Sequence, residues 1–180
     1  MLILKGNSMN LFTTSDNTKA CVQALDDVLL GKTIIESAQM LSTAIHLNDK
    51  IVEKPEGIYK KYNANEEHNK WVRENQTNYK WTVHYLLDGL TEFHYRFGKP
   101  HDTWNVAKIV VQYENDFEQG EMTPFTRKFS KDTENFDELM SMTNTCQAYQ
   151  QYLCTKWRTK TTQGKSPIWT KRGAPEFYKG

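Results

Sequence analysis

This sequence of 180 residues has few cysteines, almost no net charge and no long apolar run. Its three cysteines, Cys21, Cys146 and Cys154, are an odd set without CxxC spacing, which argues against a disulfide framework and favours a reducing compartment. The 23 Lys and Arg residues nearly balance the 22 Asp and Glu residues, so the overall charge indicates no particular partner. No segment approaches the roughly 20 apolar residues that cross a bilayer, and the apolar core of the opening segment is too short for a signal peptide. We therefore expect a soluble, cytoplasmic protein that does not bind membranes.

The sequence also lacks the short motifs of the common cofactor enzymes. It contains no Gly-rich phosphate loop, Walker pattern, dinucleotide fingerprint, HExxH or GxSxG. We therefore expect no cofactor and no metal. His101-Asp102 resembles the HD pair of metal phosphohydrolases, but that site also needs a His and an Asp from other helices. A helix cap by Asp102 is the alternative interpretation, and an HD-like nucleotide hydrolase stays a third functional hypothesis.

The clearest pattern that is present lies in residues 68–101. Apolar side chains recur there at helical spacing and predict one long helix whose inner face carries Val72, Tyr79, Val83, Leu86, Leu90, Phe93 and Phe97. The other faces carry His, Trp, Asn and Arg where a solvated helix usually carries Lys and Glu. Those faces either meet a partner or are buried within the protein. Strand-type alternation is scarce. We predict an all-α fold, a single compact domain of residues 9–180 built around this helix, with residues 1–8 as an N-terminal extension.

The remaining segments of the chain are predicted to form further helices and loops. We expect a helix capped by Asp16 that runs to about Leu30 and is ended by Gly31, and a second helix over residues 32–47 with Ile34, Ile35, Ala38, Leu41 and Ile45 inward. Residues 48–66 and 118–135 are predicted loops. Two more helices are expected, at 101–117, with Trp104 inward, and at 136–157. Gly98 is placed to end the long helix.

The C-terminal part of the sequence is basic and aromatic. From Lys156 onward it contains seven Lys and Arg residues and one Glu, a local charge of +6. Trp157, Trp169, Phe177 and Tyr178 are interleaved with the cations. This composition predicts an irregular tail that contacts phosphates and bases, while a solvated basic tail is the alternative.

Several short segments between residues 9 and 177 carry a resemblance. They are Met9-Asn-Leu-Phe, Ala24-Leu-Asp-Asp, Gly31-Lys32, Glu36-Ser-Ala-Gln-Met-Leu, His68 to Trp71 with Arg73, Arg96-Phe-Gly-Lys-Pro-His101, Thr123-Pro-Phe and Trp169-Thr-Lys-Arg-Gly-Ala-Pro-Glu-Phe. Together they resemble small phage and bacterial proteins assigned to the pyrimidine-dimer DNA glycosylase family of the endonuclease V type. The resemblance implies an all-helical protein in the cytoplasm of a phage-infected cell that binds duplex DNA.

The resemblance also implies a chemistry. Glycosylases of this type attack the sugar C1′ with an amine, form a Schiff base, and use a Glu on a helix to handle protons before β-elimination. Here that Glu would be Glu36, which the predicted helix places near a helix N-terminus beside Lys32. The family uses the α-amino group of a mature N-terminus, which needs a small second residue, but Leu2 and Asn10 are not small. The amine would therefore have to be that of a Met9 retained as the first residue of the chain, or that of Lys32.

Eight residues are candidates for contact with DNA. The cations are Arg73, Lys99, Lys171 and Arg172, the stacking or wedge residues are Trp71 and Trp169, and the hydrogen-bonding residues are His68 and Asn78. Each has a structural alternative, such as a satisfied buried His or a Trp that anchors the tail. The first hypothesis is a glycosylase-like enzyme for damaged or modified pyrimidines. The second is a non-enzymatic DNA-binding or host-takeover protein on the same scaffold.

Overall fold

The computed structural model describes residues 9–180, which fold into seven α-helices and one short 3-10 helix. In chain order these are α1 (Thr18–Ala24), α2 (Asp27–Leu47), α3 (Glu67–Glu74), α4 (Gln76–Phe97), α5 (Trp104–Val110), η1 (Val111–Tyr113), α6 (Phe136–Ser141) and α7 (Thr145–Thr162). No strand occurs within this range, so the all-α prediction is confirmed. The predicted extension, residues 1–8, lies outside the described residues. None of the described helices is long and apolar enough to cross a membrane.

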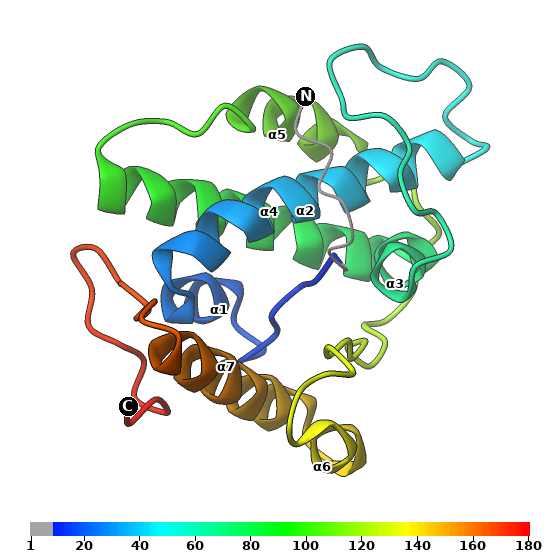
Figure 1. The fold of residues 1–180 in the computed structure, drawn as a ribbon. Coiled ribbons are helices and arrows are strands. Elements are labelled where there is room, and N and C mark those ends of the chain that lie inside the picture. The colour runs from blue at the N-terminus through cyan, green and yellow to red at the C-terminus, as the bar shows by residue number, and fades with distance from the viewer. Residues whose placement is uncertain (1–8) are drawn as a thin grey trace.

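Helices α2 and α4 form the centre of the fold. Gly89 of α4 lies against α2, where an added Cβ would lie 3.1 Å from Cγ1 of Ile34, so glycine permits this close approach. Helices α1, α3 and α5 pack against this pair, and Figure 1 shows α7 and α6 on another side of the molecule. The predicted inner face of the long helix is confirmed by the buried side chains of Val72, Tyr79, Val83, Leu86 and Leu90, while Phe93 and Phe97 are half-buried.

An extended segment, residues 9–14, joins α2 to α7 (Figure 1). The amide of Asn10 donates a hydrogen bond to Glu36 of α2, and the hydroxyl of Tyr149 of α7 donates to Asn10 Oδ1. Further along, Nε2 of Gln150 donates to the carbonyl of Thr14 at 2.9 Å. The N-terminal segment is therefore an integral part of the packed domain.

The helix predicted over residues 68–97 is in fact two helices, because Asn75 interrupts it. Asn75 has an extended backbone, and its Oδ1 accepts a hydrogen bond from the amide of Asn78 at 3.0 Å, which starts α4. The loop that contains Gly120 packs directly on this junction, because an added Cβ at Gly120 would lie 2.8 Å from Cβ of Asn75. The prediction of one continuous helix was wrong, because the apolar period continues across a break that a local cap creates.

The last predicted helix is divided in the same way. The amide of Gln147 donates to Oδ1 of Asn144 at 3.0 Å, so α7 begins with its own cap after α6 has ended. Helix α7 then continues to Thr162, beyond the predicted end at Trp157. Packing of Trp157, which is fully buried, holds this last stretch in place.

The predicted helix break at Gly31 was also wrong. Helix α2 passes through Gly31, and the boundary lies earlier, where Oδ1 of Asp26 accepts a hydrogen bond from the amide of Leu29. Asn17 caps α1 in place of Asp16. A glycine inside a helix costs about 1 kcal/mol relative to alanine, which the buried packing of α2 outweighs.

Three predictions at single positions were wrong as well. Ile35 and Trp104, expected to face inward, are 40% and 43% exposed. Asp102 does not cap the next helix, because Thr103 precedes α5 and no side chain caps it. The amide of Thr103 instead donates to Nδ1 of His101 at 3.2 Å.

The tail after α7 is irregular, as predicted, and it packs back on the domain. Nε1 of Trp169 donates to the carbonyl of Ala24 at 3.0 Å, and its ring centroid lies 5.0 Å from that of Trp157. Tyr178 packs against the same tryptophan at 5.2 Å. The aromatic residues of the tail therefore anchor it to the end of α1 and the end of α7.

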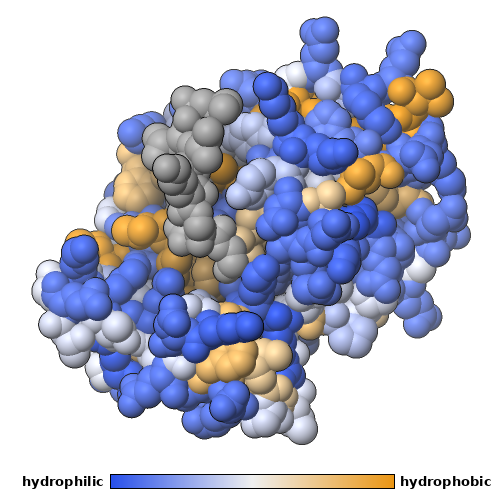
Figure 2. Space-filling view, turned by 45° about the vertical axis from the view of Figure 1, so that its right-hand side comes forward, coloured by the Kyte–Doolittle hydropathy of each residue, from blue (hydrophilic) through white to orange (hydrophobic). Residues whose placement is uncertain are grey.

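The surface is largely hydrophilic. Figure 2 shows small apolar patches separated by hydrophilic side chains on the face seen there. All three cysteines are free thiols, and burial raises the pKa of the Cys21 thiol to about 12. Cys21 is therefore a packing residue and not a nucleophile.

Candidate active site

Glu36 lies on α2 with its side chain inside the protein, at 3% exposure. Nζ of Lys32, one helical turn earlier, lies 3.4 Å from Glu36 Oε1, and the amide of Asn10 donates to Glu36 Oε2 at 3.1 Å. Burial raises the pKa of Glu36, and the Lys32 charge and the Asn10 hydrogen bond oppose this only in part. Such a carboxyl group can take up and release a proton closer to neutral pH than an exposed Glu can.

The helix terminus does not act on Glu36 as the sequence suggested. Because α2 begins at Asp27, Glu36 lies well inside the helix. The prediction that the helix N-terminus stabilises this carboxylate was wrong, since the macrodipole acts mainly within the first turn. The ion pair with Lys32 and the amide of Asn10 supply the electrostatic support instead.

Met9 directly precedes the amide that contacts Glu36, and its side chain is also buried, at 3% exposure. Backbone geometry keeps consecutive nitrogens within roughly 3.7 Å, so the nitrogen of Met9 lies within about 7 Å of the Glu36 carboxylate. The three predicted catalytic residues, Met9, Lys32 and Glu36, therefore lie together in space.

A second buried carboxylate, Glu66, lies near this group and was missed by the sequence reasoning. Its Oε1 accepts hydrogen bonds from Nδ1 of His68 at 3.1 Å and from Nζ of Lys128 at 3.0 Å, and its Oε2 accepts one from the amide of Asn69. Burial alone would raise the pKa of Glu66, but His68, Lys128 and the Asn69 amide outweigh it and lower this pKa to about 2. Glu66 is thus a permanently charged group at physiological pH.

The hydroxyl of Tyr149 connects the two carboxylates. It donates to Asn10 Oδ1 at 2.9 Å and accepts from the amide of Lys128 at 3.2 Å, while Nε2 of His68 lies 3.2 Å away. Asn10 in turn contacts Glu36 through its amide. One hydrogen-bonded network therefore fixes the N-terminal segment against α2, α3 and α7, with Glu36 at one end and Glu66 at the other.

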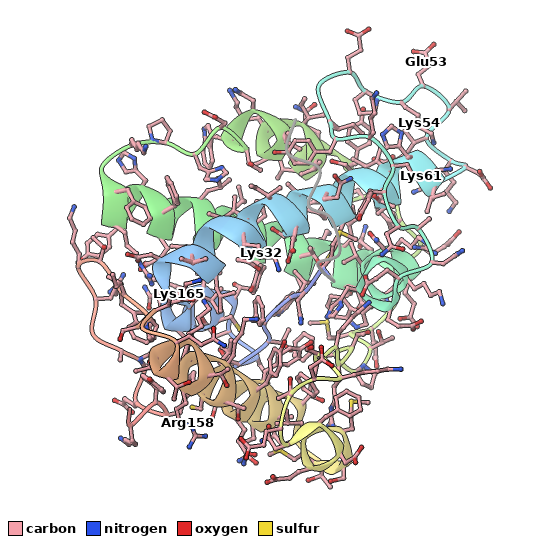
Figure 3. The ribbon with its side chains drawn as sticks, viewed as in Figure 1. Lys32, Glu53, Lys54, Lys61, Arg158 and Lys165 are labelled. Carbon is pink, nitrogen blue, oxygen red and sulfur yellow. The ribbon has the colours of Figure 1, made fainter. Side chains whose placement is uncertain are left out.

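Four partly exposed lysines lie near these acids. Lys32 pairs with Glu36, Lys128 with Glu66, and Lys160 with Asp26, at Nζ to oxygen distances of 3.4, 3.0 and 3.4 Å. The fourth, Lys156, lies one turn before Lys160 on α7 and is half-buried. Figure 3 shows Lys32 on α2, on the side of that helix that faces α7. The ammonium groups of these lysines therefore lie around the network, where α2, the N-terminal segment and α7 meet.

Three of the proposed DNA contacts, His68, Trp71 and Asn78, are buried, at 1%, 5% and 0% exposure. Nε1 of Trp71 donates to the carbonyl of Thr123, and Nδ2 of Asn78 donates to the carbonyl of Trp71 and to the hydroxyl of Thr123. These bonds attach the loop at Thr123-Pro-Phe to α3 and α4. In this conformation, none of the three side chains presents its polar atoms to the surface.

All four proposed cations, Arg172 included, lie at or near the surface. Arg73 donates to the carbonyl of Ala64 at 2.7 Å and borders two shallow surface hollows. Lys99 is exposed just beyond α4. Lys171 is exposed as well, and its Nζ donates to the carbonyl of Tyr95 at 3.0 Å. Lys99 and Lys171 can both reach a ligand beside the C-terminal end of α4.

The remaining two candidates, Arg172 and Trp169, contribute to the packing of the tail. Arg172 donates to both carboxylate oxygens of Glu92 at 2.8 Å, and Glu92 also accepts from the buried Arg96. Arg96 reaches the carbonyl of Leu25 at the junction of α1 and α2. Arg172 therefore completes a charged cluster that fixes the tail, and Trp169 anchors it nearby.

Within residues 9–180, no group of three or more His, Cys, Asp or Glu side chains is arranged to hold a metal ion. His101 of the HD pair packs edge-on against Phe93, with ring centroids 4.8 Å apart. Comparisons with protein-family models, curated protein sequences and solved structures found no match for this chain.

Proposed function

We propose that this protein is a DNA glycosylase-like enzyme that acts on damaged or modified pyrimidines, with Glu36 as its central carboxylate. One observation carries the proposal: the buried carboxylate of Glu36 contacts Lys32 and the amide that follows Met9. The Lys32 amine thus lies against this carboxyl group, and the nitrogen of Met9, which is an amine in a chain that begins at Met9, lies close by. A carboxyl group beside an amine is the set that glycosidic cleavage through an imine requires.

The chemistry assigns each group a task. The unprotonated amine attacks C1′ of the sugar, the bond between C1′ and the base breaks, and the base leaves with a proton. Glu36 supplies or accepts protons in these steps and stabilises the positive charge that develops on the sugar. Loss of the proton on C2′ then expels the 3′ phosphate by β-elimination, and water releases the amine. In this proposal the exposed lysines Lys99 and Lys171 neutralise backbone phosphates.

The experiment uses a short duplex with one pyrimidine dimer and an undamaged duplex, at two salt concentrations, with borohydride present. A covalent adduct and strand cleavage specific to the damaged duplex would support the proposal. Salt-sensitive binding with neither product would favour the non-enzymatic DNA-binding protein instead. Nucleotide hydrolysis that a chelator abolishes would favour the HD-like hydrolase.

A further inference from the structure

Lys156 differs from the other lysines around the network. Among the residues that the structure describes, no carboxylate forms an ion pair with it and no acceptor takes a hydrogen bond from its ammonium; its Nζ lies 5.9 Å from the centre of the Tyr152 ring. Lys32, Lys128 and Lys160 each pair with a carboxylate. Lys156 is therefore the amine in this region that is not already committed to a buried acid.

The surroundings of Lys156 favour its unprotonated form. Burial lowers the pKa of Lys156, and the charges of Lys160 and Lys32 lower it further, while Asp26 and Glu36 oppose the change. Only an unprotonated amine is a nucleophile, so at a given pH an amine in such a place reacts faster than an exposed lysine.

A hollow gives access to this side chain. It has a volume of about 280 Å³ and lies between α7 and the loop before α6, with Tyr152, Thr155 and Lys160 on its wall. Asp132 and Glu134, both exposed, also line it. A small carbonyl compound fits this space, and the amine lies at its wall.

We propose that Lys156 is a nucleophilic amine that forms an imine with an aldehyde bound in this hollow. The amine nitrogen adds to the carbonyl carbon, the carbonyl oxygen takes up a proton, and loss of one water molecule leaves the C=N bond. The step needs no oxidant or reductant. If the proposed function holds, the aldehyde is the open-chain sugar of an abasic site. Only this identification of the aldehyde rests on the proposed function.

The first test uses pyridoxal 5′-phosphate as the aldehyde, at pH 7, with borohydride reduction and peptide mapping. We expect Lys156 to be labelled several-fold faster than Lys165, an exposed lysine of the tail (Figure 3). Lys156→Arg removes this label, whereas Lys165→Arg leaves the rate at Lys156 unchanged. Equal rates at the two positions in the unaltered protein would overturn the inference, and that result depends on no variant.

A second test asks whether neighbouring cations cause the reactivity. Lys160→Gln and Lys32→Gln should each slow labelling of Lys156 at pH 7, because loss of a like charge favours its ammonium form, and the difference should vanish at high pH. An unchanged labelling rate in both variants would show that the neighbouring cations do not cause the reactivity of Lys156.

The outcomes also separate this inference from the proposed function. Fast labelling of Lys156 without any adduct on damaged or abasic DNA would support Lys156 as a nucleophilic amine and contradict the glycosylase function. A borohydride-trapped DNA adduct that maps to Lys32 or Met9 would support the glycosylase function and show that Lys156 is not its nucleophile.

Discussion

Nδ1 of His68 lies 3.1 Å from Oε1 of Glu66, and the two side chains are 2% and 1% exposed. Lys128 donates to the same oxygen, so this one oxygen of the buried carboxylate has two nitrogen partners. Buried charges are tolerated only where such partners compensate for the lost water. Because Tyr149 then connects His68 to Asn10, the placement of the N-terminal segment depends on this pair.

The Glu66 network should make the fold sensitive to acid. The pKa of Glu66 falls from 4.5 to about 2 on folding, so its stabilisation is complete above pH 4.5 and is lost as the pH falls toward 2. The shift corresponds to roughly 3 kcal/mol of unfolding free energy. We expect Glu66→Gln to lower the stability at pH 7 and to weaken its decline between pH 4.5 and 2. Urea unfolding across this range measures both effects.

Glu67→Gln is the matched control for this prediction. Glu67 is adjacent in sequence but exposed, and its ion pair with Lys70 joins two side chains that are 64% and 50% exposed. Exposed pairs contribute little to stability, so this variant should follow the unaltered protein across the pH range. A similar acid response in Glu66→Gln and Glu67→Gln would show that Glu66 does not control acid unfolding.

Glu36→Gln should abolish strand cleavage while DNA affinity and stability remain. Burial raises the pKa of Glu36, so its ionised form is penalised in the fold and stability falls as the pH rises through that pKa. A neutral amide of the same size avoids this cost, and the variant should be at least as stable at pH 7.

Strand cleavage and thermal unfolding of the Glu36→Gln variant are measured together. Glu53→Gln, in an exposed loop (Figure 3), serves as the control with full cleavage. Retained cleavage in Glu36→Gln would remove Glu36 from the mechanism.

The sequence predicted the helical class and the inner faces, because apolar spacing reports burial directly. It also predicted the end of the long helix, where Gly98 has φ 69°. The breaks at Asp26, Asn75 and Asn144 were missed, because an Asn or Asp side chain caps the amide three residues later only where its own backbone is extended, and the apolar spacing does not report that backbone conformation. Local spacing alone does not distinguish these residues from exposed ones.

Only the contacts of the candidate site between residues close in sequence could be predicted. Lys32 and Glu36 lie four positions apart on one helix, so their contact follows from helical spacing. His68 and Tyr149 are separated by 81 positions, and Glu66 and Lys128 by 62, so no local pattern joins them. A sequence signal for Glu66 was present only as an acid two positions before His68.

Lys99 and Lys171 should contribute to DNA affinity without supporting the fold. Both are exposed, so Lys99→Gln and Lys171→Gln should weaken binding to any duplex and lower the salt slope by about one for each phosphate that is no longer neutralised. Arg172→Gln should instead destabilise the protein, because it leaves Glu92 with fewer partners. Binding measured at several salt concentrations, beside thermal unfolding, separates the two effects. Unchanged affinity and slope in Lys99→Gln and Lys171→Gln would exclude this end of α4 from DNA contact.

Trp169 should act mainly as the anchor of the tail. Its indole is half-buried against Trp157 and donates to the carbonyl of Ala24, so Trp169→Ala loses packing and a hydrogen bond at about 2 kcal/mol of unfolding free energy. Trp169→Phe keeps most of the packing and should cost less than half of that. If Trp169 also inserts into DNA, the alanine variant will lose damage-specific affinity at a temperature where it is fully folded, while the phenylalanine variant keeps it. Equal affinity in both variants, together with the expected loss of stability, would assign Trp169 to the fold alone.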